Sequence, residues 1–326
     1  MRTLFLGSYG FGNLGDELCL IDAVRQFKPT EAWAFSVDPE FTRRCTGVEN
    51  YIQKRAQIAD VKPERIVLGG GGVGFWPSLR DSLHWMAGTE DYRIDAELHV
   101  YNIGVGKITA PEWFEDATAK DVIARLSSYT VRDHVSYWLT REWNFGRDPG
   151  LTFYPERTLP PEPFELPVVP GPLVGISITG QAAMVAAMEK NRDRISAFVR
   201  DLGDFTPVPI VSTVQDDNSD EDDVKGFEVF ADMFLKGRQL AYAQSLDRAW
   251  WKRELTPLRL KYLISKLDLL VSQRKHNIIH AIGTKTRFVG IFPDVDDSIL
   301  RIFFSLRFAI PPGSSILSLD TGAFEL

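Results

Sequence analysis

The sequence predicts an α/β fold with two domains. Two observations lead to this prediction: an apolar strand that ends in glycines before a helix recurs along the chain, and a proline-rich stretch separates the two halves. The chain has 326 residues, 44% of them hydrophobic, which is enough to fill two cores. We therefore expect one domain at residues 1–160 and a second at 161–326.

A strand and a glycine-rich turn open the first domain. Residues 3–7 form an apolar run, and apolar positions at helical spacing follow within 20–27. Asp16 and Glu17 fall at the start of this predicted helix, where acids suit the positive end of the helix dipole. The turn at 10–15 has the glycine spacing of a dinucleotide fingerprint, but the acids directly after it would repel a pyrophosphate. We therefore expect no nicotinamide or flavin cofactor.

Two more strands end in glycines before residue 110. Residues 66–68 lead into four glycines, among them Gly71 and Gly72, and residues 99–103 lead into Gly104. Four consecutive glycines cost backbone entropy, which a close approach of the backbone to another group would offset. The three transitions together predict a parallel sheet whose carboxyl edge, the usual ligand edge of an open α/β sheet, is lined with glycine loops.

Arg132 follows the next predicted strand and comes just before a helix. Asp133 is a good N-cap residue, and the spacing of Val135, Trp138 and Leu139 predicts the start of an apolar helix face. A positive charge is unfavourable at a helix N-terminus, so a function explains Arg132 better than stability does.

A proline-rich stretch separates the halves. Residues 155–172 contain seven prolines, which cannot continue a helix or a sheet and indicate an extended interdomain linker. A second α/β domain follows, with strands predicted at 173–178, 209–213 and 288–291 and a helix at 182–199.

An acidic run lies in this second domain. Residues 216–223 contain six acids, ending in Asp223. We interpret the run as a solvated loop, with divalent-metal binding as the alternative.

The stretch 267–291 brings together side chains that suit anions and protons. A predicted strand at 267–271 runs into Arg274, Lys275 and His276, and an apolar turn of helix follows. The three side chains therefore lie at the carboxyl end of a strand, where open α/β sheets bind their ligands. We expect the chemistry to take place here.

Of the five histidines, His276 is the preferred general acid. His99 lies inside an apolar strand and His280 among apolar neighbours, and both are interpreted as packed core residues. His134 is expected on the surface at a helix start, whereas His84, on the predicted helix after the four glycines, is a candidate for substrate contact. His276 and His280 are four residues apart, but the glutamate of a zinc hydrolase is missing between them, so we predict no metal site.

Charge and cysteine content exclude several classes of protein. A net charge of −7 argues against nucleic-acid or anionic-membrane binding, because both need a basic surface. No apolar run approaches the roughly 20 residues that span a bilayer. Cys19 and Cys45 are the only cysteines, which fits a reducing compartment. These features predict a soluble, cytoplasmic protein.

Five short motifs occur in order over nearly the whole chain. They are residues 10–17, the glycines 69–72, residues 103–106, Arg132-Asp133 with Ser136, and Ser272-x-Arg274-x-His276 with Ile279 and Ala281. Together they resemble the motifs of the polysaccharide pyruvyl transferase family. Lys275 stands where that family usually has leucine, and the Asp-Pro pair within 148–150 matches the family's motif approximately.

The resemblance implies two Rossmann-like domains that face each other across a cleft, similar to the GT-B glycosyltransferases. The acceptor side would lie in residues 1–160 and the donor side in 161–326. It also implies transfer of a pyruvyl group from phosphoenolpyruvate to a saccharide as a ketal, in cell-surface or exopolysaccharide biosynthesis, with no cofactor beyond this co-substrate. By motif, Arg132 and Arg274 look like ligands of the donor anion and His276 like the catalytic acid. The hypothesised substrate contacts are Asn13, Asp16, Gly71, Gly72, His84 and Lys275.

Two alternatives stay open at this point. One is a GT-B glycosyltransferase that uses a nucleotide sugar, although no clear acidic ribose clamp is found in the second domain. The other is a non-catalytic, glycan-binding relative, suggested by Lys275 and the acidic run. A lipid-linked acceptor, a homo-oligomer, and the return of the tail 301–326 to the first domain also stay open.

Overall fold

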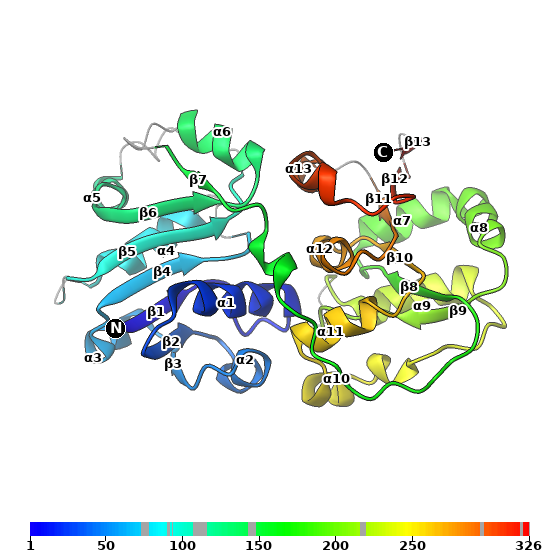
Figure 1. Cartoon of the computed structure of the whole chain (residues 1–326), viewed down its shortest axis with the longest axis horizontal. Helices are drawn as coiled ribbons and strands as arrows, with labels where there is room; N and C mark the ends of the chain where they lie inside the picture. The colour runs from blue at the N-terminus through cyan, green and yellow to red at the C-terminus, as the bar shows by residue number, and fades with distance from the viewer. Residues whose placement is uncertain are drawn as a thin grey trace. The chain divides into compact units, whose positions relative to one another are not determined.

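The computed structural model forms two compact units, Met1–Glu156 and Arg157–Leu326. The division falls four residues before the predicted boundary at 160. Figure 1 colours the first unit from blue to green and the second from green to red. The residues that the structure describes are 1–72, 78–89, 92, 94–106, 116–142, 148–215, 220–293, 297–319 and 322–325.

The first unit is built on a seven-stranded parallel sheet in the order β3-β2-β1-β4-β5-β6-β7. The predicted parallel sheet is therefore confirmed, and the chain order reverses between β1 and β4. Its strands are β1 Arg2–Leu6, β2 Glu31–Phe35, β3 Asn50–Ile52, β4 Arg65–Gly69, β5 Glu97–Ile103, β6 Leu126–Val131 and β7 Gly150–Leu151. Its helices are α1 Leu14–Phe27, α2 Pro39–Thr46, α3 Ile58–Val61, α4 Ser78–Ala87, α5 Ala117–Arg125 and α6 His134–Glu142.

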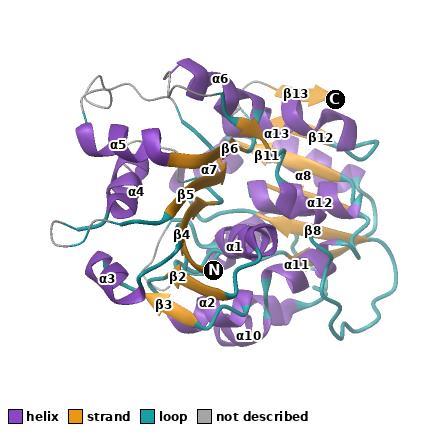
Figure 2. Cartoon of the chain, turned by 60° about the vertical axis from the view of Figure 1, so that its left-hand side comes forward, coloured by secondary structure: helices purple, strands orange, loops and turns teal. Residues whose placement is uncertain are grey.

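Alternate residues of the central strands fill cores on opposite faces of this sheet, as the pleat requires. Leu4 and Leu6 of β1 pack in the core that includes residues of α3, α4 and α5. Phe5, between them, packs in a second core with Leu20 and Ala23 of α1. Figure 2 shows α4 and α5 on one side of the sheet and α1 on the other. Helices on both faces leave the carboxyl ends of the strands as the open edge.

The second unit has a six-stranded sheet in the order β13-β12-β11-β10-β8-β9, parallel except for β13. Within the described parts of the chain, no helix combines the length and the apolar character that crossing a bilayer needs. The strands are β8 Leu173–Ser177, β9 Thr206–Pro209, β10 Leu269–Ser272, β11 Phe288–Phe292, β12 Ser315–Ser318 and β13 Gly322–Glu325. The helices are α7 Ala182–Lys190, α8 Arg192–Asp201, α9 Asp223–Phe234, α10 Arg248–Glu254, α11 Pro257–Ile264, α12 Lys275–Thr284 and α13 Asp297–Leu306.

Two element predictions in this unit were wrong in detail. The single helix expected at 182–199 is two helices, because the chain breaks at Asn191 between α7 and α8. The strand expected at 209–213 is β9, which ends at Pro209. Pro207 and Pro209 are tolerated inside it because β9 is an edge strand, where a missing N–H costs no ladder hydrogen bond.

The proline-rich stretch is bound to the second unit rather than left free. It begins as a short 3-10 helix, Pro155–Thr158, and has no regular structure from 159 to 172. The N–H of Glu162 donates to the carbonyl oxygen of Leu258 (3.0 Å), and the Tyr242 hydroxyl donates to the carbonyl oxygen of Pro167 (3.0 Å). The stretch therefore lacks regular structure over 159–172, as its prolines predict, and hydrogen bonds within the second unit fix its path.

The apolar face predicted for α6 was wrong at Trp138, whereas Leu139 packs partly buried against the core. Trp138 is 59% exposed, and the buried residues of the helix are Ser136 and Thr140. The reason is a set of polar contacts that the spacing of apolar residues does not predict. The Ser136 hydroxyl accepts the N–H of Val105 (2.9 Å) and donates to Asp133 (2.8 Å), which turns this side of α6 toward the sheet.

Candidate functional site

The first glycine turn is held by side chains at the start of α1. Asn13 is the N-cap: its Oδ1 accepts the N–H of Gly15 (2.9 Å), and its Nδ2 donates to Oδ2 of Asp16 (2.9 Å). Two of the predicted substrate contacts, Asn13 and Asp16, therefore lie side by side at the carboxyl end of β1. This is the point where the strand order reverses, which is the usual ligand position in a doubly wound sheet.

Glu17 stabilises the same turn from inside the protein. Its carboxyl group is fully buried and accepts the N–H of Gly10 (2.7 Å) and the hydroxyl of Thr42 (3.3 Å). Burial raises the pKa of Glu17 to about 8, and the charge of Asp16 adds to the increase. Asp16 and Glu17, adjacent acids at the helix start, therefore have different roles, one at the edge and one in the core.

The four glycines after β4 allow the backbone to approach α1. Gly70 and Gly71 have φ of +75° and +81°, in the left-handed region that favours glycine. A Cβ atom at Gly70 would lie 2.2 Å from Cβ of Cys19, and one at Gly71 would lie 2.8 Å from Oδ1 of Asp16. The close approach expected for this run is therefore to a helix, while Gly72 is exposed.

Arg132 lies directly after β6, at the same carboxyl edge. Its side chain is buried, and a Cβ atom on Gly104 would lie 2.4 Å from its Nε, so the missing side chain at Gly104 makes room for the guanidinium. The Tyr154 ring lies 5.4 Å from its Cζ. Among the described residues the nearest carboxylate, that of Asp133, is 3.9 Å from Nε. Among the described residues, none accepts a hydrogen bond from this Nε.

The charge of Arg132 is retained in this setting. Burial acts to lower the pKa of the guanidinium, but Tyr154 and Asp133 act in the opposite direction and the pKa is raised overall. The carboxylate of Asp133 is mainly occupied elsewhere, because it accepts the N–H (2.7 Å) and the hydroxyl (2.8 Å) of Ser136. A buried cation without a close ion pair is suited to bind an anion.

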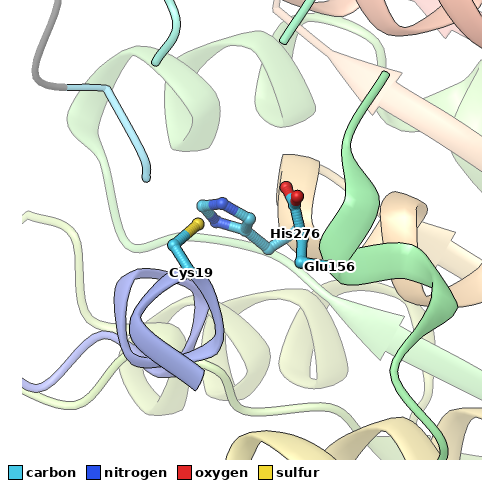
Figure 3. A group of neighbouring side chains, drawn as sticks. All are labelled: Cys19, Glu156 and His276. Carbon is cyan, nitrogen blue, oxygen red and sulfur yellow. The ribbon is translucent and has the colours of Figure 1, made fainter. Parts of the chain in front are cut away.

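A buried carboxyl group lies near the end of the first unit. Glu156 accepts a hydrogen bond from Nδ2 of Asn102 (2.8 Å), and burial raises the pKa of its carboxyl group. Asn102 has φ of +53° at an irregularity of the β5–β6 pairing. Figure 3 draws Glu156 on its 3-10 helix and Cys19 on α1, and burial raises the pKa of the Cys19 thiol as well.

His84 has a structural partner. Its Nε2 is 2.8 Å from Oδ2 of Asp116, which caps α5 by accepting the N–H of Ala119. His84 also lies in the last turn of α4. A helix that follows a strand in such a sheet runs back toward the strands' amino ends, so this turn lies away from the carboxyl edge. The structure gives a reason for His84 that needs no substrate.

The second unit places Arg274, Lys275 and His276 at the carboxyl end of β10, as predicted. Arg274 is the N-cap residue of α12, and His276 is the second residue of that helix, from which Figure 3 shows its ring extending. The Arg274 guanidinium donates from Nε to Oδ1 of Asp223 (2.6 Å) and from Nη2 to the carbonyl oxygen of Glu221. This arginine is therefore held by acids in its own unit.

Asp223 belongs to a buried polar network. Its Oδ2 accepts the N–H of Ser212 (2.8 Å), the Ser212 hydroxyl (2.9 Å) and the N–H of Thr213 (3.1 Å). Asn277 of α12 donates to the hydroxyls of Ser177 (2.8 Å) and Ser212 (3.2 Å). The network joins the ends of β8 and β10, between which the strand order of this sheet reverses.

The interpretation of residues 216–223 as a solvated loop was wrong for its last two acids. Asp222 and Asp223 are buried. Asp222 caps α9 and forms two hydrogen bonds with the Arg248 guanidinium (2.6 and 2.9 Å), and Asp223 pairs with Arg274. Both acids are balanced by arginines that are distant in sequence, which a local charge pattern does not reveal. Residues 216–219 lie outside the described part of the chain.

The other histidine predictions are confirmed. His99 is buried, with Nδ1 2.7 Å from the Ser128 hydroxyl. His280 is buried in α12, and burial lowers its pKa well below the ordinary value. His134 is exposed at the start of α6, with its ring 5.1 Å from the Phe153 ring.

Comparison with known protein families shows to which family the chain belongs. A family model of polysaccharide pyruvyl transferases matches residues 13–293. The chain belongs to the polysaccharide pyruvyl transferase family. The match spans both units and includes Arg132, Arg274 and His276, so the resemblance seen in the motifs is confirmed. No curated protein sequence matches this chain.

Solved structures share its fold at low sequence identity. A UDP-GlcNAc 2-epimerase from Methanocaldococcus jannaschii has a TM-score of 0.54 and 9% identity, covering 98% of this chain and 89% of that one. The glycosyltransferase SnogD from Streptomyces nogalater has a TM-score of 0.54 and 11% identity, with coverage of 98% and 88%. The UDP-GlcNAc 2-epimerase from Neisseria meningitidis, bound to UDP-GlcNAc, has a TM-score of 0.52 and 10% identity. The match covers 93% of this chain and 85% of that one. The predicted class, two parallel-sheet α/β domains of the GT-B kind, is confirmed.

Proposed function

We propose that this member of the family transfers the pyruvyl group of phosphoenolpyruvate to a saccharide as a ketal, in the synthesis of a cell-surface or exported polysaccharide. Family membership supports the pyruvyl transfer. The observation that carries the choice of donor is Arg132, a buried guanidinium at the ligand edge of its sheet, whose nearest carboxylate among the described residues lies 3.9 Å away. Phosphoenolpyruvate has a phosphate and a carboxylate, and the planar arginine fork binds such groups through two parallel hydrogen bonds.

Arg274 is proposed as a second ligand of the donor anion. Its hydrogen bonds to Asp223 and to the carbonyl oxygen of Glu221 use two of the five N–H donors of a guanidinium, so the fork can still donate to an anion. The start of α12 adds a positive helix end close to the same side chain. Asp223 would then fix the direction in which Arg274 points, as a positioning residue.

His276 is proposed as the general acid. It would protonate the methylene carbon of phosphoenolpyruvate, which becomes a methyl group and leaves a cationic, oxocarbenium-like carbon. One sugar hydroxyl adds to this carbon and loses its proton. The bond to the phosphate oxygen then breaks and releases phosphate, and a second hydroxyl closes the ketal. A positioned general acid contributes about 10²–10⁴-fold to such a step.

The remaining predicted contacts belong to the acceptor side of the proposal. Asn13, Asp16 and Gly71 lie together at the carboxyl edge of the first unit, where the Asp16 carboxylate can accept a sugar hydroxyl. Exposed Gly72 continues this edge, and Lys275 is half-buried beside His276. His84 is left out of the proposed site because Asp116 accounts for it.

Phosphate release from phosphoenolpyruvate with a panel of glycans tests the assignment of His276. We expect the His276→Gln variant to lose about 10²–10⁴-fold in kcat while its affinity for phosphoenolpyruvate changes little. The His84→Gln variant, altered at a histidine that is left out of the proposed site, is the control for general effects of losing an imidazole. Unchanged phosphate release in His276→Gln would remove His276 from the reaction. Thermal stabilisation by nucleotide sugars, with none by phosphoenolpyruvate, would instead favour a glycosyltransferase.

A further inference from the structure

One face of α6 carries an exposed row of ring and guanidinium side chains. His134, Trp138 and Arg141 are spaced i, i+4, i+7, which places them on the same side of the helix. His134 is exposed, Trp138 is 59% exposed and the Arg141 side chain 43%. We call these three residues the α6 stripe. A large exposed aromatic ring in such a row is a feature of recognition surfaces.

The Trp138 ring is held in place by its neighbours. The Tyr137 ring lies 5.5 Å away at an interplanar angle of 84°, and the Arg141 guanidinium lies 5.4 Å from the Trp138 ring and 5.8 Å from the Tyr137 ring. Arg141 is itself fixed by an ion pair with Asp148 (3.0 Å). A rigid ring loses little conformational entropy on binding, so it is well suited as a contact surface.

The stripe begins at the candidate site. Asp133, the residue before α6, neighbours Arg132 at the carboxyl edge of the sheet. At 1.5 Å per residue, Trp138 lies about 7.5 Å along the helix from Asp133, and Arg141 about 12 Å. The row therefore starts at the ligand edge and runs back over the surface of the first unit toward the amino ends of the strands, over a distance longer than one sugar ring.

We propose that the α6 stripe binds the saccharide chain next to the sugar that receives the pyruvyl group. This inference rests on the proposed saccharide acceptor. The C–H groups on one face of a pyranose ring are apolar and slightly positive, and they match the negative face of the Trp138 ring. Arg141 and Asp148, exposed beside the ring, offer a donor and an acceptor to the sugar hydroxyls. A polysaccharide is recognised over several sugars, and the stripe supplies the contacts beyond the reacting one.

The test measures the affinity of the full chain for cello- and galacto-oligosaccharides of increasing length by titration calorimetry, without phosphoenolpyruvate. We expect the affinity of the unmodified protein to rise with the length of the saccharide. Trp138→Ala should lose this rise, with about three- to tenfold weaker binding of the longest probe, and Trp138→Tyr should keep part of it. Removal of an exposed side chain should leave the fold intact, which a melting curve checks.

Phe308→Ala is the matched control. Phe308 is also an exposed aromatic residue, 91% exposed with the Arg307 guanidinium 4.5 Å from its ring, but it lies in the second unit. Its loss should leave the dependence on saccharide length unchanged. Equal binding of the longest probe by Trp138→Ala and the unmodified protein, or no binding of any probe by the unmodified protein, overturns the role of the stripe. Binding that depends on length and on Trp138, without pyruvyl transfer, supports the stripe and contradicts the proposed transfer.

Discussion

Arg132 and Arg274 hold equivalent positions in the two units, each between a strand's carboxyl end and a helix, yet their electrostatic settings differ. Among the described residues, the carboxylate nearest to Arg132 is 3.9 Å away, and the guanidinium lies over Gly104 and near the Tyr154 ring. Arg274 has a buried carboxylate 2.6 Å away and a second acid, Glu221, at 3.8 Å. The two local sequences look alike, but the long-range partners differ.

This contrast separates two ways of keeping a cation near a ligand site. A guanidinium without a close ion pair has its charge available for an incoming anion, and binding relieves part of its desolvation cost. A guanidinium in a tight ion pair is compensated already and is held in one orientation. We infer that Arg132 contributes more to donor affinity and that Arg274 contributes more to donor orientation.

The largest expected effect follows from breaking the ion pair of Arg274. Asp223→Asn leaves a mostly buried charge without its partner, so we expect a loss of about 3–5 kcal/mol in the free energy of unfolding. Asp133→Asn should cost about 1 kcal/mol or less, because asparagine also caps a helix well. Glu221→Gln, at a half-exposed acid, should cost under about 1 kcal/mol. Urea denaturation of the three variants measures this, and equal losses for Asp223→Asn and Asp133→Asn would abolish the contrast.

A second prediction concerns Glu17, the buried acid at the start of α1 in the first unit. Glu17 has a folded-state pKa of about 8, against an ordinary value of 4.5. Between these values the folded protein keeps a proton that the unfolded chain has lost, so the free energy of unfolding falls as pH rises, by at most about 1.4 kcal/mol per pH unit. Glu17→Gln lacks this proton. We therefore expect the free energy of unfolding of the variant to increase by about 2–3 kcal/mol, relative to that of the unmodified protein, as the pH rises from 5 to 7.

Denaturation curves at pH 5, 6, 7 and 8 provide the measurement for Glu17. Asp60→Asn, which removes an exposed carboxyl group from the first turn of α3, is the control. If the difference between Glu17→Gln and the unmodified protein stayed constant across this range, the carboxyl group of Glu17 would be ionised in the folded state.

The smallest expected effect tests the space around Arg132. A methyl group at Gly104 would lie 2.4 Å from Nε of Arg132, 2.6 Å from its Cζ and 2.5 Å from its Nη2, so Gly104→Ala must displace the guanidinium. We expect about tenfold weaker binding of phosphoenolpyruvate, measured by calorimetry. Gly150→Ala, where the nearest atom is a methyl carbon of Thr130 at 3.1 Å, should leave this affinity unchanged. Equal affinities of both variants would show that the position of Arg132 does not control donor binding.

The fold could be predicted to a large extent because its signals are local. The apolar runs before Gly7, Gly69 and Gly104 mark three strands correctly, and the acids Asp16 and Glu17 mark the start of α1. The errors occur where contacts with residues distant in sequence decide which side of an element is buried. Trp138 was expected to be buried and is exposed, because Ser136 binds Asp133 and Val105 instead.

The positions of the candidate site residues could be predicted from the sequence, but the groups that pair with them could not. Arg132, Arg274 and His276 lie at carboxyl edges, as expected from their place after strands. Asp223, the partner of Arg274, is 51 residues away in sequence, and it appeared as one acid in a charged run. The capping pattern before α9 could have indicated that Asp222 is ordered. No local signal marks Glu156, which lies among prolines and binds Asn102.

The sequence by itself determined the alternation of strands and helices, the glycine loops at the ligand edge and membership of the family, because periodicity, backbone freedom and motif order are properties of neighbouring residues. Only the tertiary structure decided which buried charges are compensated. Electrostatic compensation depends on distances in space, and Asp223 approaches Arg274 while Gly104 makes room for Arg132 only after the strands pair. The two arginines, alike in sequence, differ for this reason.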